Sequence, residues 1–240
     1  MRTTMMTATN QSFVGVAELD LLAEHFEPRR IEDVLEWSAA RYSPKLVMTS
    51  NFGVEGVVLL DHLMRVAPET PVIYLNTGFQ FRETDEVKER LRDRYKFQLI
   101  EARSVLTIEE QAKIYGERLY ESNADLCCRI RKVEPLQRAL AGFDGWLAAL
   151  RRDQSPTRAA IKVVEWNERH QLAKIHPLAK WTRSDVWSYI VKHDLPYNRL
   201  YDDGYTSIGC WPCTRRVGAG ENERSGRWAG SRKQECGIHV

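Results

Sequence analysis

The chain has five cysteines, and each lies in a short patterned segment. Two are adjacent, Cys127 and Cys128 in LCCRIRK, and two form a CxxC, Cys210 and Cys213 in SIGCWPC. The fifth, Cys236, stands alone in QECGIH. Thiolates act both as metal ligands and as nucleophiles. Two close pairs are typical of a metal or iron–sulfur site, and the unpaired cysteine is typical of a nucleophile.

Several roles for the paired cysteines can be compared. A disulfide framework is usual in short, cysteine-rich secreted chains, whereas this chain has 240 residues and an odd number of cysteines. A CxxC redox couple would leave the CC pair unexplained. Zinc and iron–sulfur clusters both accept four thiolates. Because adjacent helical residues diverge by roughly 100°, one small tetrahedral ion is an awkward target for both. The geometry therefore favours a four-cysteine iron–sulfur cluster over zinc.

Basic residues gather beside the cysteines and beside Pro/Gly turns, in segments that we expect to be loop-like. Charged residues are usually only a solvated face, but these flank the candidate chemistry. Guanidinium groups match the oxygens of sulfate and phosphate, and cations near Cys236 favour its thiolate. The pattern predicts a small, multiply anionic substrate attacked by a thiolate. The basic residues concerned are Arg129, Arg131, Lys132, Arg151, Arg152, Arg158, Arg215, Arg216, Arg224 and Arg227.

Alternating helices and strands are expected to position these residues. Repeated strand–helix units imply an α/β fold with a parallel sheet, whose ligands bind at the carboxyl ends of the strands. Two polar turns, 50–56 and 75–78, would then share one edge, where backbone N–H groups could cradle an anion. We expect strands at 45–50, 71–78 and 97–102 and one beginning within 145–155, and helices at 31–42, 57–66, 81–95, 129–142 and 182–194.

Length and composition predict a single domain with a functional tail. With 43% hydrophobic residues, the chain can bury a full core. We expect an N-terminal segment at 1–30, a nucleotide- and cluster-binding α/β domain at 31–214, and a mobile tail at 215–240 that carries Cys236. The net charge of +2 is too small to imply nucleic-acid binding. No apolar run reaches the roughly 20 residues that span a bilayer. The first residues show no apolar signal core, so a reducing cytoplasm is expected. A homo-oligomer is left open.

Five segments together resemble one family, the assimilatory sulfonucleotide reductases, and most closely its cluster-containing adenylyl-sulfate (APS) reductases. They extend over nearly the whole chain after residue 30, and the combination of CC, CxxC and ECGIH is highly specific. The segments are CCRIRKVEPLQRAL, RRDQSPTR, LPYNRLYDDGYTSIGCWPCTR, ERSGRW and KQECGIH.

The resemblance implies a fold similar to the adenine-nucleotide α-hydrolase, or PP-loop ATP pyrophosphatase, type. It implies that Cys236 attacks the sulfur of adenosine 5′-phosphosulfate (APS) and expels AMP. Thioredoxin or a glutaredoxin-like thiol then releases sulfite from the S-sulfocysteine. It also implies one [4Fe–4S] cluster on Cys127, Cys128, Cys210 and Cys213. The implied substrate-binding residues are Ser50, Gly53, Glu55, Thr77, Gly78, Lys132, Arg158, Arg224 and Arg227.

Thiols alone can complete the two-electron reduction, so the cluster need not pass electrons. Our hypothesis is that it organises Lys132 and neighbouring loops or tunes the electrostatics of the sulfo group. A mobile tail suits the chemistry, because Cys236 must reach the substrate and then present its adduct to a partner.

The chain departs from the family pattern at three places. The phosphate loop reads NFGVEG, with Gly56 in the usual Asp position, and LNTG replaces LDTG through Asn76. The tail reads KQECGIH, where KxECGLH is typical. Family members with the cluster cysteines usually take APS, so APS is expected to be preferred. The alternatives are 3′-phosphoadenosine 5′-phosphosulfate (PAPS) or use of both, and more remotely an iron–sulfur tRNA-thiolating enzyme or a zinc-stapled binding module.

Overall fold

The fold was analysed in a computed structural model that describes residues 16–239. Residues 1–15 of the expected N-terminal segment and residue 240 of the expected tail lie outside the described residues. Within the N-terminal segment the structure has a helix that the sequence did not predict. The helices are α1 Val16–Phe26, α2 Ile31–Tyr42, α3 Val54–Val66, α4 Arg82–Tyr95, α5 Ile108–Tyr115, α6 Leu119–Ser122, α7 Ala124–Cys128, α8 Glu134–Leu140 and α9 Arg183–Lys192.

One six-stranded sheet has the order β3-β2-β1-β4-β6-β5. All neighbouring pairs are parallel except β5 and β6, which form an antiparallel hairpin at one edge. The expectation of an α/β fold with a parallel sheet is confirmed, with this hairpin as the correction. The strands are β1 Leu46–Thr49, β2 Val72–Asn76, β3 Leu99–Arg103, β4 Gly145–Ala148, β5 Val164–Asn167 and β6 Leu172–Ile175.

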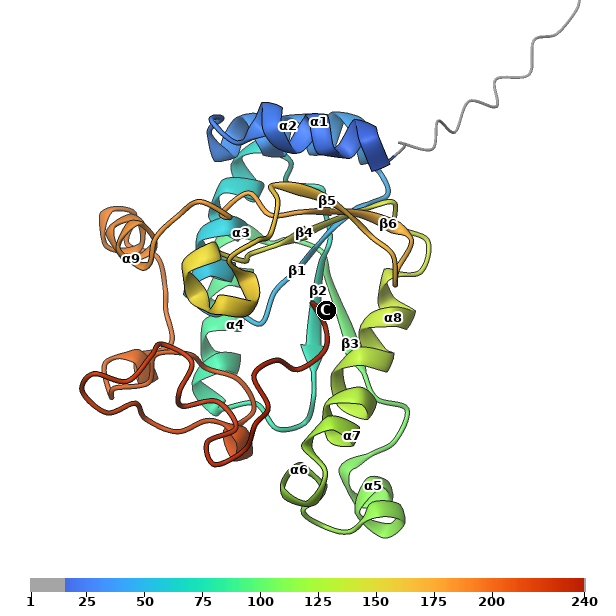
Figure 1. Cartoon of the computed structure of the whole chain (residues 1–240), viewed down its shortest axis with the longest axis vertical. Helices are drawn as coiled ribbons and strands as arrows, with labels where there is room; N and C mark the ends of the chain where they lie inside the picture. Colours follow the sequence, from blue (N-terminus) through green and yellow to red (C-terminus); the bar gives the residue numbers. More distant parts are fainter. Residues whose placement is uncertain (1–15, 240) are drawn as a thin grey trace, which may run out of the picture.

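Helices cover both faces of the sheet (Figure 1). Successive strand residues point to opposite faces, and the core divides accordingly. Met48 and Leu147 pack with α2, α3, α4 and α9 in the larger apolar cluster. Val47 and Trp146 pack with α8 in the smaller one. The central strands β1 and β4 are almost completely buried, and their sequences are short apolar runs, as is usual in parallel sheets.

Three further expectations need correction. The hairpin strands were missed because LAKI contains Lys174, whose polarity breaks the apolar run although the side chain is buried. β3 begins two residues later than predicted, at Leu99. The helix predicted at 129–142 is confirmed in place, but its first part, Arg129–Val133, is a π-helical turn between α7 and α8, so the basic residues there are not in a loop-like segment as expected. Such turns are rare and occur often at functional sites.

The expected tail returns to the sheet (Figure 1). Residues 215–239 form no helix or strand, apart from one isolated bridge between Thr214 and Arg227. Near its end, Ile238 packs against the smaller apolar cluster. The tail thus delivers its last residues to the carboxyl edge of the strands, and its mobility stays a prediction. None of the helices described between residues 16 and 239 has the length and apolarity that crossing a membrane requires.

Candidate functional site

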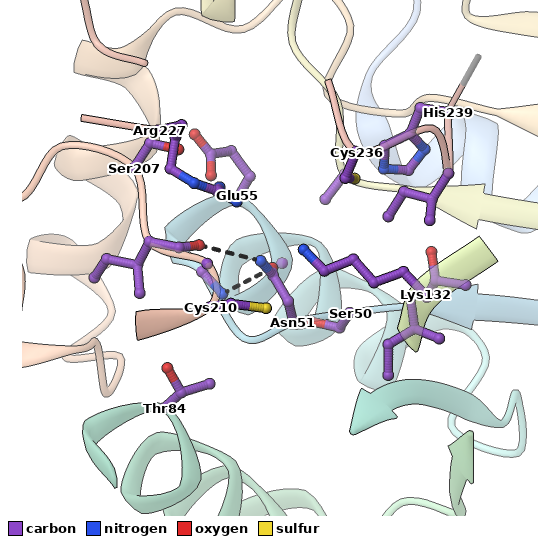
Figure 2. Close-up of a pocket in the computed structure, with 18 of the residues that line it drawn as sticks. Ser50, Asn51, Glu55, Thr84, Lys132, Ser207, Cys210, Arg227, Cys236 and His239 are labelled. Atoms are coloured by element: carbon purple, nitrogen blue, oxygen red, sulfur yellow. Dashed lines mark hydrogen bonds between the residues drawn. The ribbon is translucent and has the colours of Figure 1, made fainter. Parts of the chain in front are cut away.

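A pocket opens at the carboxyl ends of β1, β2 and β4. Its wall is completed by residues 206–210 and by tail residues between 223 and 239. Figure 2 shows Lys132, Cys210 and Cys236 arranged around one hollow. Gly78 is the one expected substrate-binding residue that is absent from the lining. The expected site residues that line it are Ser50, Gly53, Glu55, Thr77, Lys132, Arg158, Cys210, Arg224, Arg227 and Cys236.

The turn after β1 satisfies its own backbone donors. Ser50 Oγ accepts from Phe52 N–H at 3.0 Å, and Asn51 Oδ1 accepts from Gly53 N–H at 3.3 Å. These N–H groups were expected to cradle an anion, and in the structure the loop's side chains occupy them. The close packing also accounts for Gly56, because a Cβ there would lie 2.5 Å from Ser50 Oγ. The departure from the usual Asp therefore fits the local packing.

The turn after β2 has the same construction. Asn76 Oδ1 accepts from Gly78 N–H at 2.9 Å, and Thr77 Oγ1 accepts from Phe79 N–H at 3.2 Å. Gly78 has φ +76°, a conformation that suits glycine. Its role is thus to form the turn. Thr77 instead reaches the cysteines, since its Oγ1 lies 3.3 Å from Cys210 Sγ.

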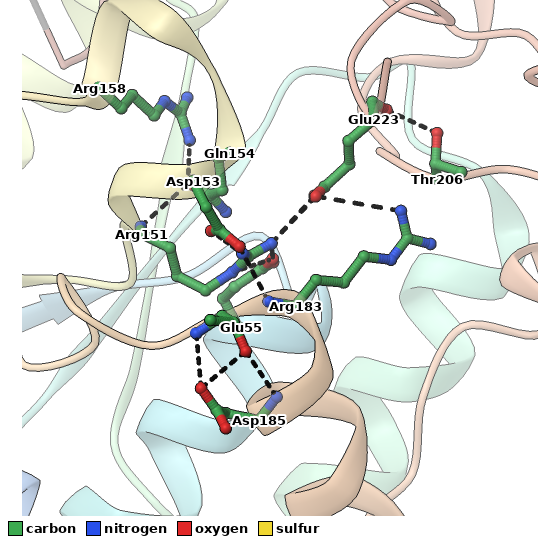
Figure 3. A network of polar contacts seen from close by, with 10 residues as sticks. Glu55, Arg151, Asp153, Gln154, Arg158, Arg183, Asp185, Thr206 and Glu223 are labelled. Atoms are coloured by element: carbon green, nitrogen blue, oxygen red, sulfur yellow. Dashed lines mark hydrogen bonds and ion pairs between the residues drawn. The ribbon is translucent and has the colours of Figure 1, made fainter. Parts of the chain in front are cut away.

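Glu55 lies in a buried charge network at one side of the pocket (Figure 3). Arg151, whose side chain is 0% exposed, donates to Glu55 Oε1 at 2.9 and 3.1 Å. It also pairs with Glu223 at 3.1 Å and with Asp153. Burial and the Glu55 carboxylate raise the pKa of Glu223, against the effect of Arg151. The arginine therefore holds together two carboxylates from distant segments, which fixes the loop that carries Glu223.

Lys132 extends from the π-helical turn into the pocket, with 9% of the residue exposed. Burial opposes its charge, but the electrostatic interactions with Cys210, Cys236 and Cys128 outweigh burial and raise the pKa of Lys132. The ammonium group therefore stays charged between the cysteine pairs and the candidate nucleophile. Its charge can therefore act on the paired cysteines and on Cys236.

The four paired cysteines line a second, smaller pocket next to the first. All five cysteines are free thiols. Burial, with neighbouring thiolates, raises the pKa of Cys127 to about 12, and burial raises that of Cys128 to about 11. Among residues 16–239 no three Cys, His, Asp or Glu side chains form a metal-ligand group. The donor set itself fits an iron–sulfur cluster, because four thiols from two segments face one pocket, and metal binding would remove their protons.

Two of the expected substrate-binding arginines contact the tail instead. Arg158 donates to both carboxylate oxygens of Glu235 at 2.9 Å, and Arg224 donates to Oε2 at 3.0 Å. Burial opposes ionisation of Glu235, but the hydrogen bonds and charge of Arg158 lower its pKa. An internal carboxylate therefore lies between the arginines at the pocket wall, next in sequence to Cys236.

Arg227 and Lys132 are the expected anion-binding residues that have no carboxylate partner within residues 16–239. The guanidinium of Arg227 lies over Trp228 at 4.6 Å, and its buried Nε lacks a hydrogen-bond partner in the same part of the chain. Both side chains line the pocket. An unpaired buried cation is costly, so this pair marks where an anionic group of a ligand would be stabilised.

Some pocket residues were missed at the level of sequence. Tyr201 lies in a segment that had been recognised as a motif, yet it was assigned no role. The same holds for Glu235, which does not line the pocket but pairs with two arginines that do. Glu223, Gln154 and Trp228 gave no separate signal, because their positions depend on loops that meet only in the fold. His239 also lies in the pocket wall, beside Cys236 (Figure 2).

The largely parallel sheet, with a cation-lined pocket at the carboxyl ends of its strands, defines an α/β protein with a PP-loop type of fold. Residues 45–216 match the Phosphoadenosine phosphosulfate reductase domain, and the chain belongs to that family.

Several proteins are similar in sequence to this chain over most of its length. An adenosine 5′-phosphosulfate reductase of Halalkalibacterium halodurans is 50% identical, with 86% of this chain and 90% of that protein covered. A phosphoadenosine 5′-phosphosulfate reductase of Gloeobacter violaceus is 47% identical, with 96% and 98% covered. The crystal structure of a PAPS reductase from Candida auris superposes with TM-score 0.74 at 32% identity, covering 84% of this chain and 98% of that one. The Candida glabrata FMN adenylyltransferase, 17% identical with TM-score 0.53 over 81% of this chain and 70% of that one, shares the fold alone.

Proposed function

We propose that the protein is an oxidoreductase that reduces APS to sulfite and AMP. The observation that carries the proposal is the placement of Cys236. The tail brings this thiol to the same pocket as Lys132 and Arg227, two cations without carboxylate partners among residues 16–239. A thiolate nucleophile beside cations that stabilise developing charge is what attack on an anionic sulfo group requires.

The reaction proceeds in two displacements. The Cys236 thiolate attacks the sulfur of APS, an S–S bond forms, and the S–O bond to phosphate breaks. AMP leaves with the electron pair. A donor thiol then attacks Cys236 Sγ, and sulfite leaves with the electron pair of the S–S bond. The second thiol of the donor resolves the mixed disulfide and restores Cys236, so a dithiol such as thioredoxin supplies two electrons.

The chain's own residues have separate tasks. Lys132 and Arg227 neutralise the sulfo and phosphate oxygens, and Arg158 and Arg224 supply further guanidinium donors once the substrate competes with Glu235 for them. Ser50, Gly53 and Thr77 shape the wall at the ends of β1 and β2, and Glu55 is fixed by Arg151. The four paired cysteines would hold an iron–sulfur cluster, which supplies charge and rigidity beside Lys132.

APS is the proposed substrate because relatives named APS reductases are 50% and 45% identical, and because the four paired cysteines resemble those of the cluster-containing members of the family, which usually take APS. PAPS is the second candidate, since a 47% identical relative is named a PAPS reductase. Comparing kcat/KM for the two nucleotides, with thioredoxin and then glutaredoxin as donor, tests the proposal. Release of sulfite and AMP from APS with a clear preference supports it. Sole use of PAPS would contradict it.

Anaerobically purified protein should contain about four iron atoms and about four acid-labile sulfides per chain. The four thiols facing one pocket are the reason. The Cys213→Ser variant should lose most of the iron, whereas Cys236→Ser, the matched control outside the cysteine pairs, should retain it. Metal analysis measures the iron and zinc content per chain. Stoichiometric zinc without iron would contradict the proposed iron–sulfur cluster.

Replacing Glu235 by glutamine should tighten AMP binding by about tenfold, corresponding to about 1.4 kcal/mol. The neutral amide leaves Arg158 and Arg224 available to the phosphate, because charged hydrogen bonds to them are lost. Titration calorimetry measures the change. Glu221→Gln is the control, since Glu221 pairs at the surface with Arg215 and does not line the pocket. An affinity for AMP that is unchanged or weaker in Glu235→Gln would show that the carboxylate does not compete with nucleotide.

A further inference from the structure

The last described residues of the chain are held on the sheet by contacts that follow Cys236 directly. Arg169 donates to the Gly237 carbonyl at 2.8 Å, and Lys174 Nζ donates to the His239 carbonyl at 3.1 Å. Gly237 has φ +85°, and a Cβ there would lie 3.4 Å from Val133. The tail therefore turns at a glycine and then accepts hydrogen bonds through two of its backbone carbonyls.

Lys174 is an unusual side chain in this position. It lies on β6 with 1% of the residue exposed, although lysine is seldom fully buried. Its ammonium lies 4.9 Å from the Trp146 ring centre and 3.9 Å from Glu165, its one ion-pair partner within residues 16–239. Burial lowers the pKa of Lys174 to about 8. A buried ammonium needs hydrogen-bond acceptors, and the tail carbonyl of His239 supplies one.

The side chains of the tail fit the same place. The His239 ring stacks on Trp146, with ring centres 5.6 Å apart and planes 18° apart. Trp146 is itself held, because its Nε1 donates to Thr49 Oγ1 at 2.8 Å. Ile238 packs against the apolar cluster around Trp146. Together Trp146, Arg169 and Lys174 form a tail socket, in which an aromatic surface and two cationic donors receive residues 237–239.

We propose that Lys174 is a positioning residue, which holds the end of the tail in this socket and so keeps Cys236 at the pocket. Lys174 does not line the pocket and does not touch the substrate. It acts through the His239 carbonyl, three residues beyond the nucleophile. The role of Cys236 in this inference rests on the proposed function, whereas the docking itself is a property of the chain without substrate.

The test is the rate at which iodoacetamide alkylates Cys236 in the full-length protein, followed by peptide mapping. Lys174→Met retains the apolar stem over Trp146 and removes the donor. We expect alkylation to accelerate about tenfold, because about 1.4 kcal/mol of docking free energy is lost. Transfer of the sulfo group from APS in a single turnover should slow, because an undocked tail does not hold Cys236 at the pocket. AMP affinity should stay within about twofold, because Lys174 does not line the pocket and Glu235 keeps its own contacts with Arg158 and Arg224.

Lys162→Met is the matched control, because this exposed lysine pairs with Asp20 outside the socket, and its alkylation rate should equal that of the unmodified chain. Arg169→Ala is the second variant. Arg169 is an exposed residue that donates to the Gly237 carbonyl. Arg169→Ala should therefore fold, and it tests the tail socket even if Lys174→Met does not fold. If Cys236 is alkylated at the original rate in the folded variants, the proposal that the tail socket positions Cys236 is wrong. Failure of the parent protein to bind AMP or accept a sulfo group would instead contradict the proposed function and leave the alkylation result standing.

Discussion

Sulfite release from APS falls by on the order of 10³-fold or more when Cys236 is replaced by serine. The hydroxyl keeps the size of the side chain but is a far weaker nucleophile than a thiolate at neutral pH. The four other cysteines are not expected to substitute for it, because they would be the ligands of the proposed cluster, although Cys210 lines both pockets. A thioredoxin-coupled assay of sulfite and AMP measures the loss.

The control for this variant is its binding of AMP. Cys236 follows the arginine contacts of Glu235 and is not an anchor of the fold, so AMP affinity and the unfolding midpoint should match those of the parent protein. More than a tenth of the original turnover in Cys236→Ser, at normal AMP affinity, would mean that another group makes the covalent intermediate. The account of the tail would then be wrong.

Replacing Arg151 by methionine should lower the free energy of unfolding by about 3–5 kcal/mol. Arg151 is completely buried, and its loss leaves the carboxylates of Glu55 and Glu223 facing each other without the cation between them. Burial and the Glu55 carboxylate already raise the pKa of Glu223 against the opposing effect of Arg151, so removal of the arginine leaves two buried carboxylates that repel each other. Urea unfolding followed by tryptophan fluorescence gives the change.

The neighbouring residue provides the matched control. Arg152 pairs with Glu27 at the surface, with 31% of its side chain exposed. Exposed ion pairs contribute little, so Arg152→Met should cost less than about 1 kcal/mol. Equal losses in the two variants would show that the buried network in Figure 3 has no special role in stability.

The sheet was predictable where hydrophobicity and chain order agreed. β1, β2 and β4 are short apolar segments followed by polar turns or helices, and their location was confirmed. The β5–β6 hairpin was not predictable by the same argument, because Lys174 interrupts the apolar pattern and is stabilised by Glu165, Trp146 and the returning tail. Contacts that are far apart in sequence decide such a strand, and a local pattern does not contain them.

The site shows the same division. Spacing singled out the cysteines, and the fold places the paired ones around one pocket and Cys236 in the wall of the next. The arginines were identified as basic residues near turns, but sequence could not distinguish Arg158, held by Glu235, from Arg227, which has no carboxylate partner within residues 16–239. Ion pairing depends on which segments meet. For the same reason, the backbone donors of the turn after β1 could not be recognised as already satisfied.

The central claim is that Cys236 receives the sulfo group of APS. The most direct measurement is the intact mass of the protein after incubation with APS in the absence of a reductant, with peptide mapping of the product. The account predicts a gain of one sulfo group on Cys236, release of one AMP, and no gain in the Cys236→Ser variant. An unchanged mass in protein whose fold and iron content are intact, or an adduct on another cysteine, would contradict it.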